Sequence, residues 1–158
     1  MDRLETIECT SCGVANRAPA SRLVAGAYPK CGKCGRPLFA GEPHNVDLSD
    51  AFDRTLAATS IPVLADFWAS WCGPCKAMAP HFRAAAAALE PQVRLLKVDT
   101  EKLPDISARH RVQSVPTLIL FQHGVEIARQ SGLLDAARIE RWVALSLDSG
   151  SGQTRQAR

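Results

Sequence analysis

The chain has 158 residues, 46% of them hydrophobic and 22% charged, which is typical of a globular protein with a substantial core. Its 19 basic and 16 acidic residues are interspersed and leave a net charge of only +3, so the composition argues against a nucleic-acid partner. The first residues lack the apolar segment of a secretory signal, and no apolar run approaches the ~20 residues that span a bilayer, so we expect a cytoplasmic protein without a membrane partner.

Residues 1–42 form the first predicted domain and contain two Cys-x-x-Cys pairs. Cys9 and Cys12 form one pair, and Cys31 and Cys34 form the other, with 18 residues between the pairs. This spacing is typical of a four-cysteine structural zinc site. Four thiolates leave no open coordination position, so we expect one structural Zn²⁺ and no catalytic metal. Two redox-active dithiols or an iron-sulfur site remain the alternatives.

The same segment has little apolar periodicity and many glycines and prolines. A unit of this size usually needs a metal or disulfides for stability, because its own core is too small. We therefore expect a zinc-ribbon-like module that is separable from the rest of the chain, with residues 39–44 as the linker.

Helical and strand patterns alternate over residues 43–147, the second predicted domain. The pattern predicts a mixed central sheet with helices on both faces, an α/β fold. The polar residues 148–158 are predicted to be a disordered tail. The predicted elements are helices over 47–56, 75–89 and 105–111 and from 135, strands over 62–68 and 93–98, and a hairpin over 117–130.

The third cysteine pair lies between a predicted buried strand and a predicted helix, in the sequence Trp71-Cys72-Gly73-Pro74-Cys75. A helix N-terminus stabilises a thiolate, so the pKa of Cys72 should fall. We expect Cys72 to be the accessible nucleophile and Cys75, one turn deeper, to be the resolving thiol. A zinc half-site is the alternative, but the four upstream cysteines already form a complete set.

Asp66 is the only charged residue of the predicted strand before this motif. Burial should raise its pKa, which suits a group that exchanges protons with Cys75. A carboxylate held by Lys97 for structural reasons is equally compatible with the residues alone. His81, His110 and His123 are expected to be solvated surface groups.

The sequence from Trp71 to Cys75 resembles the active site of the thioredoxin family, and the similarity extends over residues 46–147. Together with the four upstream cysteines, it resembles the zinc-containing bacterial branch of that family. The resemblance implies a thioredoxin fold, reduction of protein disulfides, and recycling by thioredoxin reductase and NADPH. It implies no organic cofactor bound to the chain.

The resemblance also implies roles for individual residues. Asp66 matches the buried carboxylate beneath the active site, and Lys97 matches its basic neighbour. Pro116 matches the proline that faces the disulfide and whose bond to the preceding residue, here Val115, is cis. Trp68 matches an active-site tryptophan. The expected substrate-binding residues are Trp71, Gly73, Pro74, Val115, Pro116 and Gly132.

Two other functions remain open from the sequence. The first is an oxidant or isomerase of an oxidising compartment, which a much higher reduction potential than that of thioredoxin would indicate. The second is a zinc-dependent binding or chaperone module, which would retain its function after replacement of both Cys72 and Cys75 by serine.

Overall fold

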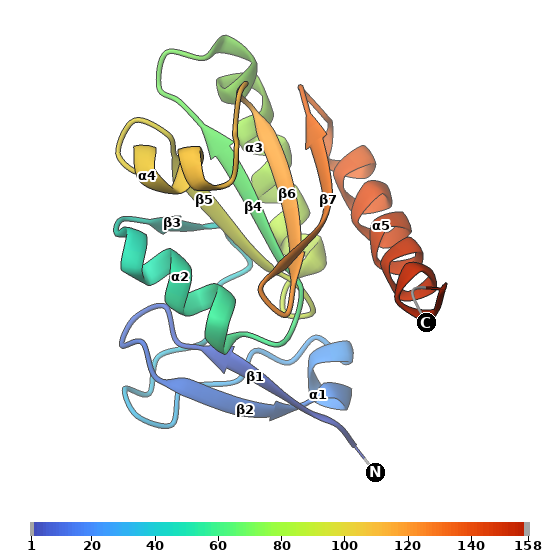
Figure 1. The fold of residues 1–158 in the computed structure, drawn as a ribbon. Helices are drawn as coiled ribbons and strands as arrows, with labels where there is room; N and C mark the ends of the chain where they lie inside the picture. The colour runs from blue at the N-terminus through green and yellow to red at the C-terminus, as the bar shows by residue number, and fades with distance from the viewer. Residues whose placement is uncertain (1, 157–158) are drawn as a thin grey trace.

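The computed structural model describes residues 2–156 and consists of a small N-terminal unit packed against a larger α/β unit (Figure 1). The small unit contains the antiparallel strands β1 (Leu4–Glu8) and β2 (Ala15–Pro19) and the short helix α1 (Ala20–Val24). It lies at the end of the larger unit where β4 begins, whereas α3 begins at the opposite end (Figure 1).

The larger unit is built on a five-stranded sheet with the strand order β3-β5-β4-β6-β7. The first three strands in this order are parallel, and β6 and β7 run antiparallel to their neighbours, so the predicted mixed sheet is confirmed. The sequence did not predict β3, because three residues are too few to show a strand pattern. The strands are β3 (His44–Val46), β4 (Val63–Trp68), β5 (Arg94–Asp99), β6 (Thr117–Gln122) and β7 (Val125–Ser131).

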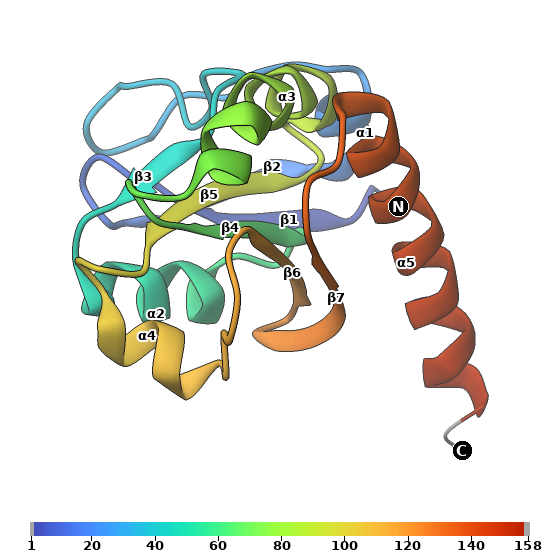
Figure 2. The ribbon, with the colours of Figure 1, turned by 90° about the horizontal axis from the view of Figure 1, so that it is seen from above.

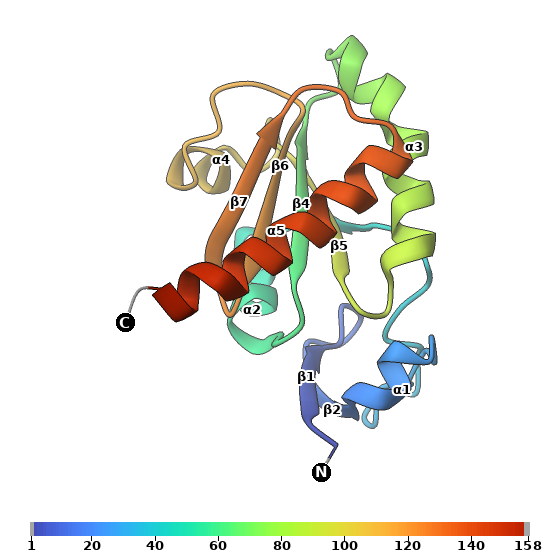
Figure 3. The same cartoon turned by 90° about the vertical axis from the view of Figure 1, so that its right-hand side faces the viewer.

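Helices cover both faces of this sheet. The helices α2 (Ser49–Ala58) and α4 (Pro104–Arg109) lie on one face, and α3 (Gly73–Leu89) lies on the other (Figure 2). Helix α5 (Ala136–Gln156) packs beside α3 and crosses in front of the sheet (Figure 3). Each face buries an apolar core, and together the two cores fix the strands that carry the functional residues. No helix within residues 2–156 is long and apolar enough to cross a membrane.

Helix α5 includes most of the segment that the sequence predicts to be a disordered tail. The predicted apolar face ends at Leu147, but the helix continues to Gln156. Extension of an existing helix adds a backbone hydrogen bond for each residue that is fixed, so a polar segment can continue it without an apolar face. Residues 157–158 of the predicted tail lie outside the described residues.

The N-terminal unit has a larger core than its sequence suggests. Ile7, Leu23, Leu38 and Phe39 are each at most 2% exposed, and Ile61 of the larger unit completes the same cluster. The core is therefore shared between the two units. The sequence pattern could not show this, because the contributing residues are far apart along the chain.

Buried polar contacts also cross the junction between the two units. The Glu8 carboxylate accepts a hydrogen bond of 2.6 Å from Arg54 Nε on α2. Arg94 of β5, only 2% exposed, donates to the Leu38 carbonyl over 2.7 Å and to the Glu8 carbonyl over 3.4 Å. Leu38, which directly precedes the expected linker, is thus held by the larger unit.

Candidate redox and zinc sites

Cys72 and Cys75 form a disulfide at the N-terminus of α3. Cys72 is the N-cap of this helix, and its Sγ accepts a hydrogen bond of 3.1 Å from the backbone amide of Cys75. Pro74 occupies the first turn, where a missing backbone donor costs nothing. The predicted position of the motif, between a buried strand and a helix, is confirmed. Cys72 Sγ therefore lies where the unpaired amides of a helix favour negative charge.

A second loop meets this disulfide from the β6 side. Cys72 Sγ lies 3.6 Å from the carbonyl oxygen of Val115, and Val115 packs against the cluster of Ala69, Cys72 and Cys75. The bond between Val115 and Pro116 is cis, as expected. The structure thus brings two sequence-predicted segments, 71–75 and 115–116, into one site.

Gly132 connects a third segment to the same loop. Its backbone amide donates to the Pro116 carbonyl over 2.9 Å. Its φ of +99° lies in the region that disfavours residues with a side chain, which explains a glycine here. A Cβ at Gly132 would contact nothing within 4 Å, so the surface beside Pro116 is open.

The exposed fractions distinguish Trp71 from the two cysteines. Trp71 is 71% exposed, whereas Cys72 is 3% and Cys75 is 5% exposed. The expected difference in access between the two cysteines is therefore not visible in the disulfide form. What distinguishes Cys72 is its N-cap position and its contact with Val115.

Asp66 lies on β4, is 2% exposed, and pairs in register with Lys97 on β5. Burial raises the pKa of Asp66 to about 7, against the opposing attraction of Lys97. Its Oδ1 atom has no hydrogen-bond partner within residues 2–156. Lys97 Nζ lies 4.8 Å from the centre of the Trp68 ring. The predicted buried carboxylate and its basic neighbour are thus on adjacent central strands.

The expectation that His110 is a solvated surface group is wrong. Its ring packs against Phe52, Phe67 and Phe121, with centroid distances of 5.5, 6.4 and 5.3 Å. Burial and the neighbouring Arg109 lower its pKa. A histidine at the end of a short helix gives no sequence signal for this packing, because the three rings come from α2, β4 and β6.

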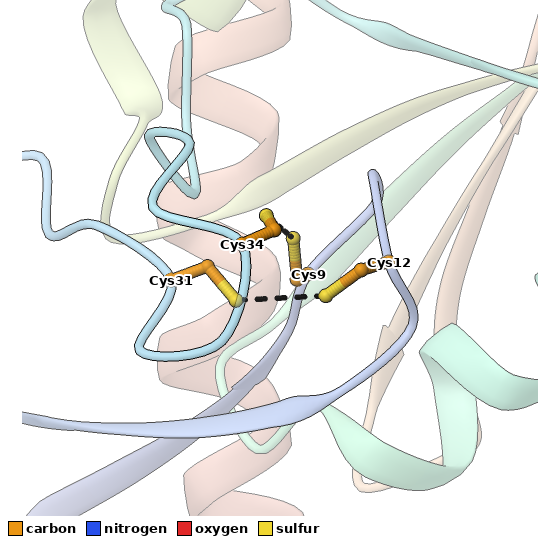
Figure 4. A group of neighbouring side chains, drawn as sticks. All are labelled: Cys9, Cys12, Cys31 and Cys34. Atoms are coloured by element: carbon orange, nitrogen blue, oxygen red, sulfur yellow. Dashed lines mark hydrogen bonds between the residues drawn. The ribbon is translucent and has the colours of Figure 1, made fainter.

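The four N-terminal cysteines converge from two turns, as Figure 4 shows. Their Sγ atoms all lie within 4.8 Å of one another. The Sγ atoms of Cys9 and Cys34 are 3.7 Å apart, and those of Cys12 and Cys31 are 3.6 Å apart. Sulfurs bound at about 2.3 Å around one tetrahedral Zn²⁺ would be about 3.8 Å apart, so the donor set fits this ion.

Backbone hydrogen bonds shape both cysteine turns. Gly13 donates to the Cys9 carbonyl over 2.7 Å, and Gly35 donates to the Cys31 carbonyl over 2.9 Å. Hydrogen bonds to the Cys31 sulfur, the strongest of them from the backbone of Cys34, lower the pKa of Cys31 to about 6. They outweigh burial, which raises this pKa. A thiolate, the form that binds zinc, is therefore favoured at this position.

Asn16 is a site residue that the sequence did not reveal. Its Nδ2 atom donates to Cys31 Sγ over 3.5 Å, and its Oδ1 atom accepts the Gly32 amide over 2.9 Å. It lies on β2, between the two cysteine pairs in sequence and beside the second pair in space. The contacts join residues that are 15 and 16 positions apart in the chain, so no local sequence pattern marks them.

Known proteins match both units. The family described as Thioredoxin matches residues 44–145, and the family described as Thioredoxin 2, N-terminal, matches residues 8–36. Thioredoxin C-3 of Corynebacterium nephridii is 42% identical over 147 residues, which cover 92% of this chain and 98% of that protein.

Solved thioredoxin structures are similar to the larger unit. The thioredoxin of Malassezia sympodialis superposes with a TM-score of 0.62 at 26% identity, over 68% of this chain and 92% of its own. A mutant thioredoxin from Halobacterium salinarum gives a TM-score of 0.59 at 29% identity, over 66% of this chain and 89% of its own.

The disulfide at a helix N-terminus, the thioredoxin fold and these similarities describe a thiol-disulfide oxidoreductase that reduces protein disulfides and is recycled by thioredoxin reductase and NADPH. The chain belongs to the thioredoxin family and carries the N-terminal zinc ribbon of the thioredoxin 2 type.

Proposed function

We propose that Cys72 is the residue that attacks the substrate disulfide. The Cys72 thiolate bonds to one substrate sulfur, and the other substrate sulfur leaves as a thiolate that takes up a proton. The observation that carries this assignment is the N-cap position of Cys72 Sγ, which accepts the Cys75 amide at the start of α3. The helix N-terminus stabilises the attacking thiolate.

Cys75 then resolves the mixed disulfide. Its thiolate bonds to Cys72 Sγ, and the second substrate sulfur leaves and is protonated, so the substrate gains two electrons and two protons. Asp66 accepts the proton of Cys75. Its raised pKa supports this role, because a group near neutrality can both accept and return a proton. Lys97 tunes the charge of Asp66 from the adjacent strand.

The substrate surface surrounds the disulfide. Its members are the exposed Trp71, the helix-start residues Gly73 and Pro74, and the loop residues Val115, Pro116 and Gly132. The open space beside Gly73 and Gly132 supports close approach of a partner backbone. The partners are proteins with accessible disulfides, and a cytoplasmic thioredoxin reductase returns the disulfide to the dithiol with electrons from NADPH.

The zinc ribbon holds one structural Zn²⁺ through Cys9, Cys12, Cys31 and Cys34. Bound zinc links the two cysteine turns and keeps their sulfurs as thiolates. Within residues 2–156 one set of four Sγ atoms lies close together, which supports one ion, and the closed donor set supports a structural role. No organic cofactor takes part, because the electrons pass between sulfurs.

A trapping experiment tests the roles of the two cysteines. The Cys75→Ser variant should form a stable mixed disulfide with a disulfide-containing protein such as insulin, while Cys72→Ser should trap nothing and reduce nothing. Non-reducing electrophoresis and mass spectrometry of the linked peptides identify the bonded sulfur. Trapping by Cys72→Ser with none by Cys75→Ser would reverse the roles.

A further inference from the structure

A salt-bridged arginine on β7 contacts the chain just before the loop that meets the disulfide. Arg129 Nη1 donates to the Arg111 carbonyl over 3.0 Å, and its Nη2 donates to the His110 carbonyl over 2.5 Å. Glu126 fixes the guanidinium from the other side, through bonds of 2.9 Å to Nε and 2.8 Å to Nη2. All three guanidinium nitrogens are thus used, in the planar arrangement that arginine alone provides.

The contacted segment contains a residue in an unfavourable backbone conformation, which neighbouring contacts must hold in place. Arg111 has a φ of +55°, in the left-handed region that is unfavourable for a residue with a side chain. His110 is held from the opposite side, because its ring is packed among three phenylalanine rings of the core. The start of the loop is therefore fixed by the core on one side and by Arg129 on the other.

The far end of the loop is fixed from the same strand. Thr117 Oγ1 donates to the Ser114 carbonyl over 2.7 Å and lies 3.0 Å from Ser131 Oγ. The Gly132 amide holds the Pro116 carbonyl. Residues 112–116 thus bridge two anchors, Arg129 at one end and the pair Ser131 and Gly132 at the other, both at or next to β7.

We propose that Arg129, held by Glu126, is a positioning residue for substrate binding that sets the place of the Val115–Pro116 backbone relative to Cys72 Sγ. This inference rests on the proposed role of residues 115 and 116 in the substrate surface. A protein substrate must align its chain along this backbone, whereas a small disulfide needs only access to Cys72. Loss of Arg129 therefore weakens reaction with protein disulfides and spares reaction with small ones.

The test uses the pre-reduced, zinc-loaded full-length protein, so that recycling by a reductase does not enter. Single-turnover rate constants are measured by stopped flow with insulin and with 5,5′-dithiobis(2-nitrobenzoate). Arg129→Ala should lower the rate constant for insulin about fivefold and change that for the small disulfide less than about twofold. Arg129→Lys should also lower the rate constant for insulin more than that for the small disulfide. The reason is that an ammonium cannot contact both carbonyls and the carboxylate in one plane.

Arg109→Ala is the matched control. Arg109 lies on α4 and pairs with Asp53, but its side chain makes no hydrogen bond to the loop within the described part of the chain. It should behave as wild type with both substrates. Amide hydrogen exchange should rise in Arg129→Ala within residues 111–115, with the rest of the protein unchanged.

Three outcomes would overturn the inference. An equal loss with both substrates would show a general effect on Cys72, and no loss with either would show that the loop keeps its place without Arg129. A wild-type protein that reduces only the small disulfide would contradict both the proposed substrate surface and this inference. If Arg129→Ala does not fold, Arg129→Lys and Glu126→Gln give the same comparison.

Discussion

Asp66 and Lys97 are direct partners on the neighbouring parallel strands β4 and β5, and both strands are central in the sheet. Asp66 is nonetheless left with one carboxylate oxygen unpartnered within the described residues. Burial outweighs the attraction of Lys97, and the pKa of Asp66 rises to about 7. The protein therefore keeps an acid near neutrality inside its core, at a cost in stability that depends on pH.

The first prediction concerns the pH dependence of stability. Asp66 has an ordinary pKa of 3.8 when unfolded, so between about pH 4 and pH 7 the folded protein holds a proton that the unfolded chain releases. The free energy of unfolding should fall as the pH rises through this range and level off above it. In Asp66→Asn this contribution disappears, and at pH 8 the variant should be more stable than wild type by about 2–4 kcal/mol.

Urea unfolding of the oxidised protein from pH 4 to pH 8.5 measures this difference. Asp148→Asn, which changes an exposed carboxylate on α5, is the control and should follow wild type. Burial also raises the pKa of Glu90 to about 7, so the difference between variant and wild type is the informative quantity. Parallel curves for Asp66→Asn and wild type would show that Asp66 does not titrate in this range.

The second prediction concerns catalysis by the same group. Asp66→Asn should slow the resolution of a mixed disulfide about 10-fold or more, because in the proposed mechanism Asp66 is the proton acceptor of Cys75. The initial attack by Cys72 should change less. Rapid-quench sampling of the mixed disulfide during single turnover separates the two steps. Equal slowing of both steps would indicate that Asp66 has a structural role.

The chemistry of this protein is easier to predict from its sequence than the contacts between residues that are far apart in the chain. The two pairs Cys9/Cys12 and Cys31/Cys34 and the motif around Cys72 could be assigned because spacing and position along one segment determine their function. The α/β order followed from local periodicity, which adjacent residues show directly.

The contacts that the sequence did not reveal join residues far apart in the chain. Asn16 reaches Cys31, Arg129 reaches His110, and Arg94 reaches Leu38, each through a polar side chain with many possible partners. No periodicity marks such residues. The extension of α5 was missed for a different reason, since a helix can continue through polar residues that have no preference of their own for it.

The third prediction concerns the residue that supports the zinc ligands. Asn16→Ala removes the hydrogen bond to Cys31 Sγ and the one that holds the Gly32 amide. Zinc affinity should fall about 10-fold, as expected for an outer contact that orients a ligand. Competition with a chromogenic chelator measures this affinity. Asn45→Ala, which changes an exposed asparagine on β3, should leave it unchanged, and an equal loss in both variants would exclude a specific role for Asn16.

The fourth prediction concerns the junction between the zinc ribbon and the larger unit, and it revises the expectation of a separable module. Arg94 is 2% exposed, its guanidinium lies 4.2 Å from the centre of the Phe39 ring, and it donates to the Leu38 and Glu8 carbonyls. Removing residues 1–43 would expose this cation and its partner Glu90 and would also open the shared core at Ile61. The shortened protein should therefore be markedly less stable than the full chain.

Arg94→Met in both lengths of protein isolates the contribution of the junction. In the full chain it leaves the buried Leu38 and Glu8 carbonyls without their donor and Glu90 without its ion-pair partner, at a cost of about 3 kcal/mol. In the shortened protein the Leu38 and Glu8 acceptors are already gone, so the same substitution should cost much less.

Urea unfolding of wild type and Arg94→Met, each as the zinc-loaded full chain and as the shortened protein, gives the four free energies of unfolding. Arg83→Met, at an exposed position of α3, is the control. A shortened protein that does not fold would also show that the ribbon is integral to the fold. The ribbon would instead be separable if the substitution cost the same in both lengths of protein and the shortened protein were as stable as the full chain. The contacts of Arg94 across the junction would then contribute nothing to the stability of the thioredoxin unit.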